Sequence, residues 1–366
     1  MTRAIRSGIV LVSISSSVFH LGVCEFMNVP ALTRSAFCAG ALVASACGLL
    51  SGCGGGHAAS SSSGTSATSA NAAIAEEGPQ LGYLWSASDQ SLRPVMGVPG
   101  ASQFGPSVVA PGVYVAAAAS AQSGAAILVD KAGDVNLMSL PTGSPLPLAG
   151  VHVSGNVQIA FSPSGADAVV FAAGQSAAYL LTGLSTPTQA QVQVLSSPSA
   201  PVAMAVSDTG QVVSATGASP TTLTLLTSND ARVGTLGGFG GIAYLPGGSS
   251  LLAVDSANGT LTLVSSSGAP QTIASNAFRS PFAVAASQDG KAAVVANGGD
   301  ASVVRIDLTN PTNQMRIPCV CQPDRLSALS GNAVFALTGS GTTPAWMVDA
   351  SASQPQTLFI PAIVKQ

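Results

Sequence analysis

Residues 281–310 read PFAVAASQDGKAAVVANGGDASVVRIDLTN. Three apolar runs, rich in Val and Ala, alternate here with two short turns that contain Gly, Asn and Asp. Short runs of this kind bounded by such residues are typical of β-strands that are joined by hairpins. The stretch therefore predicts three consecutive antiparallel strands, and it provides a template for the rest of the chain.

The first part of this template, an apolar run that ends in a small polar turn with Gly, recurs along the chain. The turns close on Gly165, Gly210, Gly248, Gly290 and Gly331, at intervals of 45, 38, 42 and 41 residues. A second and a third apolar run follow each turn, and then a weaker fourth. Four short strands at this spacing are the period of a β-propeller blade.

The number of blades follows from the two ends of the repeat. Residues 104–148 fit the same template, which gives six full units. Residues 83–100 match the third and fourth strands of another unit, so we expect them to form a closing blade, joined by residues 362–366 (AIVKQ). An open ring would expose sheet edges. We predict an all-β protein whose residues 80–366 form a β-propeller of four-stranded blades, seven in number, with six as the alternative.

The composition excludes several classes of protein. Only 7% of the residues are charged, against about 25% in an ordinary soluble domain. The 12 Lys and Arg do not outnumber the 15 Asp and Glu, so the chain lacks the basic excess that binds a phosphate backbone. We therefore expect no nucleic-acid partner, and the scarcity of Glu, Lys and Arg excludes coiled coils.

The N-terminal region has the pattern of an export signal. Arg34 precedes an uncharged apolar run of 15 residues, 36–50, which ends in Leu50-Ser51-Gly52-Cys53. A charged residue followed by such a run is typical of a signal peptide, and the ending looks like a bacterial lipobox. We predict that residues 1–52 are a signal region, that translation starts at Met27, and that Cys53 carries the lipid, including palmitate.

The residues after Cys53 predict a tether. Residues 54–79 are dominated by Ser, Ala and Gly and show no hydrophobic period, so residues 53–79 are expected to link the lipid to the propeller flexibly. The predicted location is the bacterial cell envelope, anchored to a membrane by this lipid. In a Gram-negative host we expect the outer membrane, because Gly54 is not a retention signal of the Asp type.

The template stretch resembles the YVTN family of β-propeller repeats. The features that carry the resemblance are Pro281 before the inner strand, the Asp289-Gly290 turn, the Val294-Val295-x-Asn297 strand and the Ile306-Asp307 ending. The likeness is partial in residues 157–275 and 324–350, where most units lack the Asp-Gly turn. Members of this family range from lactonase-like enzymes to surface proteins, so the resemblance implies the fold rather than one function.

The candidate ligand site is one mouth of the central channel, where loops lead into the innermost strands. These loops carry Gln103 and Asn156, and the residues that we single out are His152, Phe239, Arg279, Asp324 and Arg325. They would suit an anionic or polar ligand. The alternatives are a local Asp–Arg surface pair, worth little energy, and a packed or solvated histidine.

The last candidates are Cys319 and Cys321, which flank a single residue. The sequence leaves three interpretations of this pair open. The two cysteines are small buried side chains, they form a local disulfide, or they are half of a metal site that would need at least two more ligands. We predict no metal, no cofactor and no catalytic residue, since no Ser has Gly at both −2 and +2 as a hydrolase nucleophile elbow requires.

Two functions remain open at this point. The outer strands are rich in Ser, Thr, Gln and Ala, which suits contact with an envelope protein or a glycan. We therefore predict a monomeric binding or interaction platform without catalysis. The alternative is a lactonase-like hydrolase with a polar site at the channel mouth.

Overall fold

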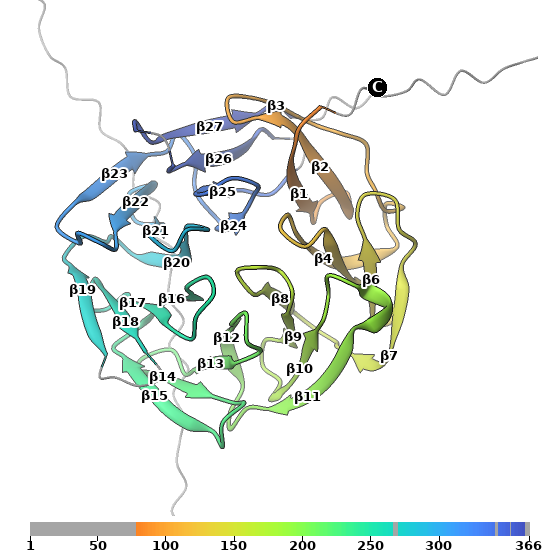
Figure 1. The fold of residues 1–366 in the computed structure, drawn as a ribbon, viewed down its shortest axis with the longest axis horizontal. Coiled ribbons are helices and arrows are strands. Elements are labelled where there is room, and N and C mark those ends of the chain that lie inside the picture. The colour runs from red at the N-terminus through yellow and green to blue at the C-terminus, as the bar shows by residue number, and fades with distance from the viewer. Residues whose placement is uncertain (1–77, 266–269, 341–342, 352, 363–366) are drawn as a thin grey trace, which may run out of the picture. The chain divides into compact units, whose positions relative to one another are not determined.

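The computed structural model describes residues 78–265, 270–340, 343–351 and 353–362. These residues form 27 β-strands and one short 3-10 turn, Pro187–Gln189. The strands make seven antiparallel sheets arranged around a central axis (Figure 1). The predicted all-β propeller with seven blades is confirmed. The signal region, Cys53 and the tether up to residue 77 lie outside the described residues, as do residues 363–366 of the predicted closing segment.

The blades follow one another in chain order. Blade 1 has three strands, β1 (Gln80–Ser86), β2 (Ser91–Val98) and β3 (Ala101–Phe104). Blade 2 contains β4 (Tyr114–Ser120), β5 (Ala125–Asp130), β6 (Asp134–Ser139) and β7 (Leu146–His152), and blade 3 contains β8 (Val157–Phe161), β9 (Ala168–Ala172), β10 (Ala177–Thr182) and β11 (Gln191–Ser196). Blade 4 contains β12 (Pro201–Val206), β13 (Val212–Thr216), β14 (Thr221–Leu225) and β15 (Ala231–Leu236).

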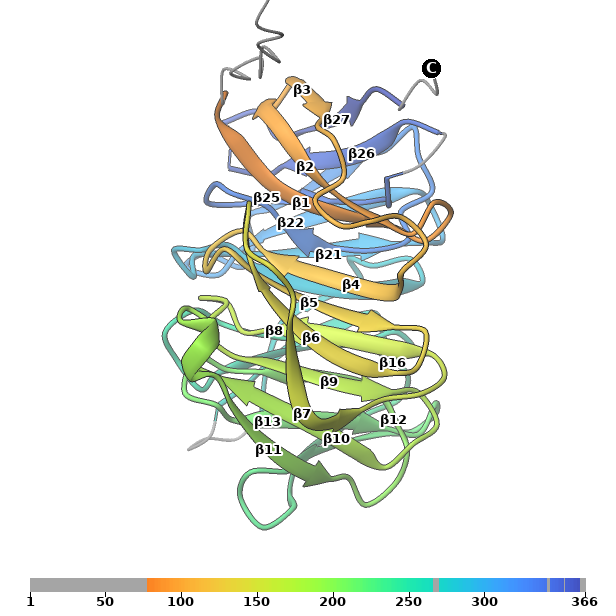
Figure 2. The ribbon, with the colours of Figure 1, turned by 90° about the vertical axis from the view of Figure 1, so that its right-hand side faces the viewer.

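The remaining three blades have four strands each. Blade 5 contains β16 (Phe239–Tyr244), β17 (Leu251–Asp255), β18 (Thr260–Val264) and β19 (Gln271–Ser275). Blade 6 contains β20 (Pro281–Ala286), β21 (Ala292–Asn297), β22 (Ser302–Asp307) and β23 (Gln314–Pro318), and blade 7 contains β24 (Ser327–Ala328), β25 (Val334–Ala336), β26 (Ala345–Asp349) and β27 (Gln356–Ile360). Figure 2 shows neighbouring blades stacked along the side of the ring.

The second strand of each four-stranded blade forms the core. Every residue of β9, AVVFA, and of β17, LLAVD, is buried, because a neighbouring blade covers each face of the sheet. Strands that are buried on both faces read as continuous apolar runs. This explains why the second run of the sequence repeat is the most uniformly apolar.

A serine at the end of the innermost strand explains the repeated polar turn. Ser162, Ser207 and Ser287 are buried. In each case the hydroxyl oxygen accepts a hydrogen bond from a backbone N–H at the point where the second strand of the hairpin begins. For Ser207 the donor is the N–H of Gln211, at 3.0 Å. The bond satisfies a donor that the tight turn would otherwise leave unpaired.

Blade 1 differs from the sequence prediction. Its first strand, β1, begins beside the end of β24, where the Ser330 N–H donates to the Leu81 carbonyl at 2.5 Å, and it ends beside Ser340. It therefore runs antiparallel to β24, as a second strand does, while β3 lies beside the outermost strand β27. Residues 80–104 occupy the second, third and fourth positions, not the third and fourth.

Blade 1 and blade 7 close the ring through packed side chains. Each sheet is built from its own segment, so no sheet contains strands from both ends of the chain among the described residues. A cluster that we call the closing seam joins the two blades, and its members are Leu81, Leu84, Val95, Leu329, Val334, Ala336, Ala345, Met347 and Ile360. Whether residues 362–366 join the closing blade stays a prediction, because residues 363–366 lie outside the described part of the chain.

Truncation of Met347 tests the seam. Met347 is fully buried there, and replacing such a side chain by Ala costs about 2–5 kcal/mol because a cavity remains. We expect Met347→Ala to lower the free energy of unfolding in urea by that amount. The matched control is Met315→Ala on β23, where the side chain is 39% exposed. An equal loss in both variants would contradict this role of the seam.

Candidate functional site

The predicted mouth residues do not form one site. His152 ends β7, the outermost strand of blade 2, where its ring is 58% exposed and its Nδ1 lies 3.2 Å from Asp134 Oδ1. The structure therefore places His152 at the outer rim. The expectation that it reaches the central channel assumed that the whole connection between β7 and β8 lies at the mouth.

The other four candidates precede or begin inner strands, but they are dispersed. Phe239 begins β16 and packs partly against the core between blades 4 and 5, while Arg279 is exposed ahead of β20. Arg325 Nε donates to Asp324 Oδ1 at 2.9 Å. This is the local Asp–Arg pair that the sequence left open as an alternative, and Asp324 and Arg325 line one cavity together.

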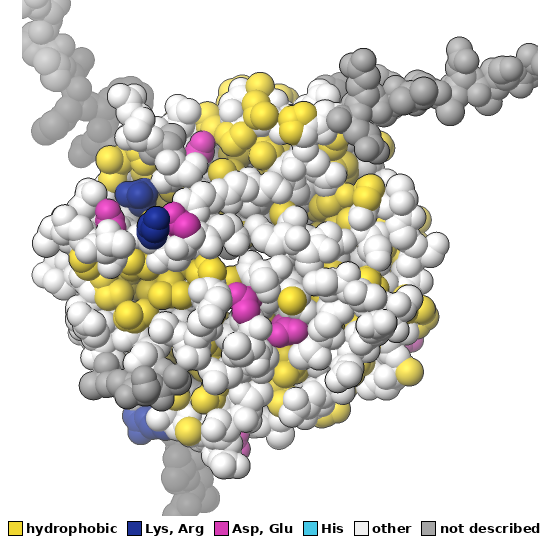
Figure 3. All heavy atoms as spheres, in the orientation of Figure 1, with side chains coloured by type: hydrophobic (Ala, Val, Ile, Leu, Met, Phe, Trp, Pro, Cys, Tyr) yellow, Lys and Arg dark blue, Asp and Glu magenta, His cyan; other side chains and the backbone are white. Residues whose placement is uncertain are grey.

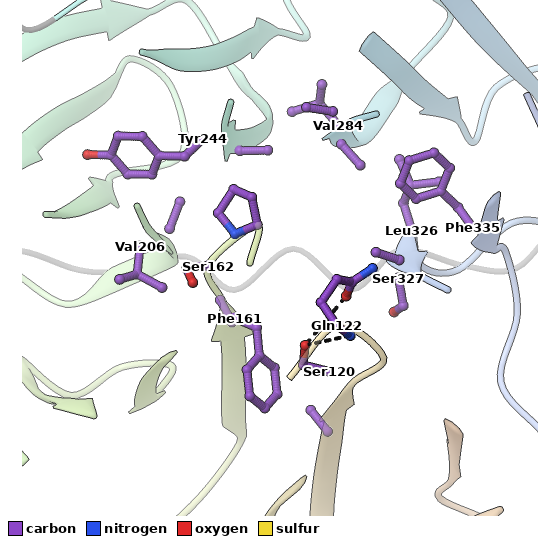
Figure 4. A pocket seen from close by; sticks show the side chains of 18 of the residues that line it. Ser120, Gln122, Phe161, Ser162, Val206, Tyr244, Val284, Leu326, Ser327 and Phe335 are labelled. Atoms are coloured by element: carbon purple, nitrogen blue, oxygen red, sulfur yellow. Dashed lines mark hydrogen bonds between the residues drawn. The ribbon is translucent and has the colours of Figure 1, made fainter. Parts of the chain in front are cut away.

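The channel is hollow at the opposite end, where the inner strands finish. A cavity of about 290 Å³ opens there, lined by residues of β4, β8, β12, β16, β20 and β24 and their turns. Most of its wall is apolar, and eight of the 23 lining residues are alanines, among them Ala118, Ala160, Ala205, Ala243, Ala285 and Ala328. We call it the central cavity; Figure 4 shows its lining from close by.

Five Ser and Gln side chains supply hydrogen-bonding groups of the central cavity: Ser120, Gln122, Ser162, Gln288 and Ser327. Gln122 Nε2 donates to the Leu329 carbonyl at 3.4 Å, and Gln288 Nε2 donates to the Pro163 carbonyl at 3.5 Å. The second bond links blade 6 to blade 3 across the channel. The Gln122 Oε1 also accepts the Ser120 hydroxyl at 3.4 Å, so this carboxamide is held through both its nitrogen and its oxygen.

The central cavity has one titratable lining residue, Tyr244. Burial raises the pKa of its phenol above the usual value, and Figure 4 shows the hydroxyl pointing away from the cavity. A general acid or base needs a pKa near the working pH and a position within reach of the ligand. The described lining residues therefore provide a surface for binding and no proton-transfer group.

Asp208 organises the turns around this mouth. Its carboxylate accepts the Ser164 N–H of blade 3 at 2.7 Å and the Gly247 N–H of blade 5 at 2.8 Å. Burial on its own would raise the pKa of Asp208, but the N–H of Gly247 and the groups of Ser164 and Ser162 outweigh it and hold the pKa below the usual value. Three neighbouring hairpins are thus tied by one ionised group.

Asp167 behaves in the opposite way. Burial raises its pKa, the N–H of Gly183 partly offsets this, and the nearby charge of Asp208 raises it further. The folded protein therefore holds the proton of Asp167 more tightly than the unfolded chain does, and the protonated carboxyl is the form that stabilises the fold. Both groups lie among structural hydrogen bonds, and neither lines the central cavity.

Figure 3 shows that charged side chains are few on the face of the ring turned toward the viewer, where uncharged and apolar groups prevail. Among the described residues, no group of three or more His, Cys, Asp or Glu side chains gathers as a metal site. Within the same residues, no helix is long and apolar enough to cross a membrane.

Sequence reasoning missed the central cavity because it looked at the starts of the inner strands. The signal that identifies the other end is the repeated turn itself, since the serine of each turn marks where an inner strand finishes. Gln122 and Gln288 stand in two of these turns. The other residues of these turns are mostly Ser, Ala, Pro, Thr, Asp and Gly. The long polar side chains of Gln122 and Gln288 are therefore the sequence feature that indicates the site.

The comparisons with known proteins support the fold alone. No family model and no curated protein sequence matches the chain. Among solved structures, a protein of unknown function from Desulfotomaculum acetoxidans is similar with a TM-score of 0.57 and 8% identity, over 78% of this chain and 100% of that chain. A streptogramin B lyase is similar with a TM-score of 0.50 and 15% identity, over 70% and 84% of the two chains.

A third similar structure is the β-propeller domain of Cps50 (Swd1) from Myceliophteria thermophila. Its TM-score is 0.50 at 14% identity, and the match covers 68% of this chain and 87% of that chain. Proteins of such different kinds share this architecture, so the class that the fold defines is the β-propeller, and the activity has to be argued from the site.

A change of charge at Asp208 tests its role through pH. Because folding lowers the pKa of Asp208, its contribution is present above the pKa of the unfolded chain and is lost as the pH falls toward the lower pKa of the folded state. We expect Asp208→Asn to lower the free energy of unfolding at pH 7 by about 1 kcal/mol, a value discounted for partial exposure.

The difference between wild type and Asp208→Asn should shrink below about pH 4, where the wild-type carboxyl becomes protonated. Urea denaturation between pH 3 and pH 7 measures it. Asp230→Asn, at an exposed turn between β14 and β15, is the control and should change little. A difference that stays constant with pH would show that the charge of Asp208 contributes nothing.

Proposed function

We propose that the chain is an envelope-anchored lipoprotein whose propeller acts as a binding platform without catalysis. Its central cavity holds a small uncharged, largely apolar group of an envelope protein or a glycan. The carrying observation is the lining of the cavity, which combines small apolar side chains and fixed carboxamides with no group that titrates near neutral pH.

The size of the cavity fits this role. Ligand sites are mostly apolar hollows with a few convergent polar groups, and they begin at about 300 Å³. The central cavity is of that order, so it accommodates one ring or one branched side chain rather than a large molecule. Gln122 and Gln288 fix the orientation of such a group by accepting its hydrogen-bond donors.

The lactonase-like alternative has little support. A hydrolase needs a base and a positively charged clamp in one pocket. His152 lies on an outermost strand, Arg279 is exposed, and neither lines the central cavity. Likeness to a streptogramin B lyase at 15% identity extends to the fold only.

The anchor rests on the sequence. The lipobox-like Leu50-Ser51-Gly52-Cys53 follows an apolar run, and the YVTN resemblance of residues 281–310 is in keeping with an exported surface protein. The first described residues, Gly78 and Pro79, precede β1 directly. A tether of residues 53–79 would thus place the lipid at a root-mean-square distance of roughly 30 Å from blade 1, from the dimensions of flexible chains.

Filling the cavity tests the platform. Ala328 on β24 is exposed to the cavity, so Ala328→Phe occupies the space without disturbing the core. The control is Val194→Phe, because Val194 is 66% exposed on the outermost strand β11. Partners captured by cross-linking in whole envelopes should bind Ala328→Phe at least about tenfold more weakly, a loss of 1.4 kcal/mol, and bind the control normally.

Two outcomes would refute the platform. The first is capture that is equal in wild type and Ala328→Phe, since the cavity would then play no part. The second is turnover of a lactone panel by the purified protein that is abolished by His152→Ala, which would establish the hydrolase instead.

Removal of the lipid-bearing thiol tests the anchor separately. Cys53→Ala should release the protein from membranes into the soluble envelope fraction, because the acyl chains supply the membrane affinity. Fractionation followed by mass spectrometry of the mature N-terminus measures it. Cys321→Ala is the matched control and should leave the protein membrane-bound; unchanged fractionation of Cys53→Ala would contradict the anchor.

A further inference from the structure

The connection between β23 and β24 contains a disulfide that the binding platform does not use. Cys319 and Cys321 are joined across a single residue, with their Cα atoms 5.0 Å apart. Such a bond closes a very short loop, so it constrains the unfolded chain far less than a long-range disulfide does. Its contribution to holding the propeller together is therefore small.

Other contacts already hold this connection in place. The Cys319 N–H donates to the Ala301 carbonyl at 2.9 Å, and the Asp324 N–H donates to the Leu337 carbonyl at 2.9 Å. Thr357 Oγ1 on β27 donates to the Pro318 carbonyl at 3.0 Å. The segment is thus fixed on both sides of the disulfide, and reduction of the bond should leave the blade intact.

The two half-cystines have different surroundings. Cys319 is 8% exposed and belongs to the core cluster between blades 6 and 7. Cys321 is half-buried and lines an open cavity of about 540 Å³, together with Gln322, Asp324 and Arg325. An incoming group therefore reaches Cys321 from solvent, whereas Cys319 is covered by protein.

Two features beside Cys321 favour an incoming thiolate of a protein. The guanidinium of Arg325 lines the same cavity, paired with Asp324, which leaves its remaining N–H groups for other acceptors. A nearby cation stabilises a thiolate. Val320, between the two cysteines, is 87% exposed, so it offers an apolar contact to a partner that approaches the disulfide.

We propose that Cys319–Cys321 is a thiol–disulfide exchange site whose substrate is a dithiol protein. The partner's thiolate attacks Cys321 Sγ, the bond to Cys319 Sγ breaks, and the electron pair leaves on Cys319, which takes up a proton. The thiolate of the partner's second cysteine then attacks the sulfur of the partner's first cysteine, which is bonded to Cys321. This breaks the mixed disulfide, and Cys321 leaves as a thiolate that takes up a proton. The partner is oxidised to a disulfide, and Cys319 and Cys321 are reduced.

The first test measures whether the bond exchanges in the folded protein. The full chain is equilibrated with mixtures of reduced and oxidised dithiothreitol, quenched with acid and alkylated. Trypsin cleaves after Arg316 and Arg325, so both cysteines lie in one peptide, residues 317–325. We expect reversible conversion between oxidised and alkylated peptide with an unchanged circular dichroism spectrum.

The second test assigns the attacked sulfur and the role of Arg325. In variants that keep one cysteine of the pair, Cys321 of Cys319→Ser should react with 5,5′-dithiobis(2-nitrobenzoate) at least about tenfold faster than Cys319 of Cys321→Ser, as followed on the peptide 317–325, since access limits the reaction. In the wild-type disulfide, Arg325→Gln should slow attack by dithiothreitol on the order of threefold, the effect of one screened charge. Arg232→Gln on β15 is the control and should not change the rate.

Three results would overturn the proposal, whatever becomes of the binding platform. One is a bond that is reduced only when the protein is unfolded, and another is loss of the folded spectrum on reduction, since both would make the disulfide structural. The third is equal or faster reaction of Cys319, which would place the attack on the wrong sulfur.

Discussion

Face-to-face packing of neighbouring sheets is the interaction on which this structure depends. A chain with 7% charged residues has few ion pairs to specify its fold. Each blade instead buries both faces of its second strand against its neighbours, as the cluster shared by blades 2 and 3 shows for Ile127 and Val170. Dispersion and the hydrophobic effect act on every interface in the same way.

Close packing also determines where backbones approach one another. Gly241 on β16 has φ of +120°, and a Cβ there would lie 2.8–2.9 Å from backbone atoms of Ala283 and Val284 on β20. Only glycine fits such a contact. The inner strands of blades 5 and 6 therefore come close together here, beside Ile242 and Val284, which line the central cavity.

The fold was predictable from the sequence because the same turn recurs at a nearly constant interval. Most of these turns contain a serine that caps a backbone N–H and a glycine with positive φ. Blade 1 was assigned one strand too far out, since a second and a third strand are both largely buried and their apolar patterns look alike. The strand β1 shows this, because its central residues Gly82–Leu84 are as buried as those of a second strand. Chain order alone does not separate these positions.

The site was less predictable. Charged residues are rare in this chain, and the sequence therefore predicted a ligand site from Arg279, Asp324 and Arg325, which precede inner strands, together with His152. Side chains from several blades meet at the axis, and their sizes determine which end of the channel is open. A local sequence pattern does not show which side chains will meet there. Gln122 and Gln288, which stand in turns 166 residues apart (288 − 122), come together only when the ring closes.

Hydrogen exchange of the native protein, resolved by mass spectrometry, tests the central claim most directly: among the described residues, packed side chains and isolated hydrogen bonds, rather than a shared sheet, close the ring between blades 1 and 7. The account predicts that the amides of β1, β2 and β3 exchange together through a partial opening, faster than those of β9, β13 and β17, which have a continuous blade on both sides. Exchange of β1–β3 as slow as that of β13 would contradict closure without a shared sheet.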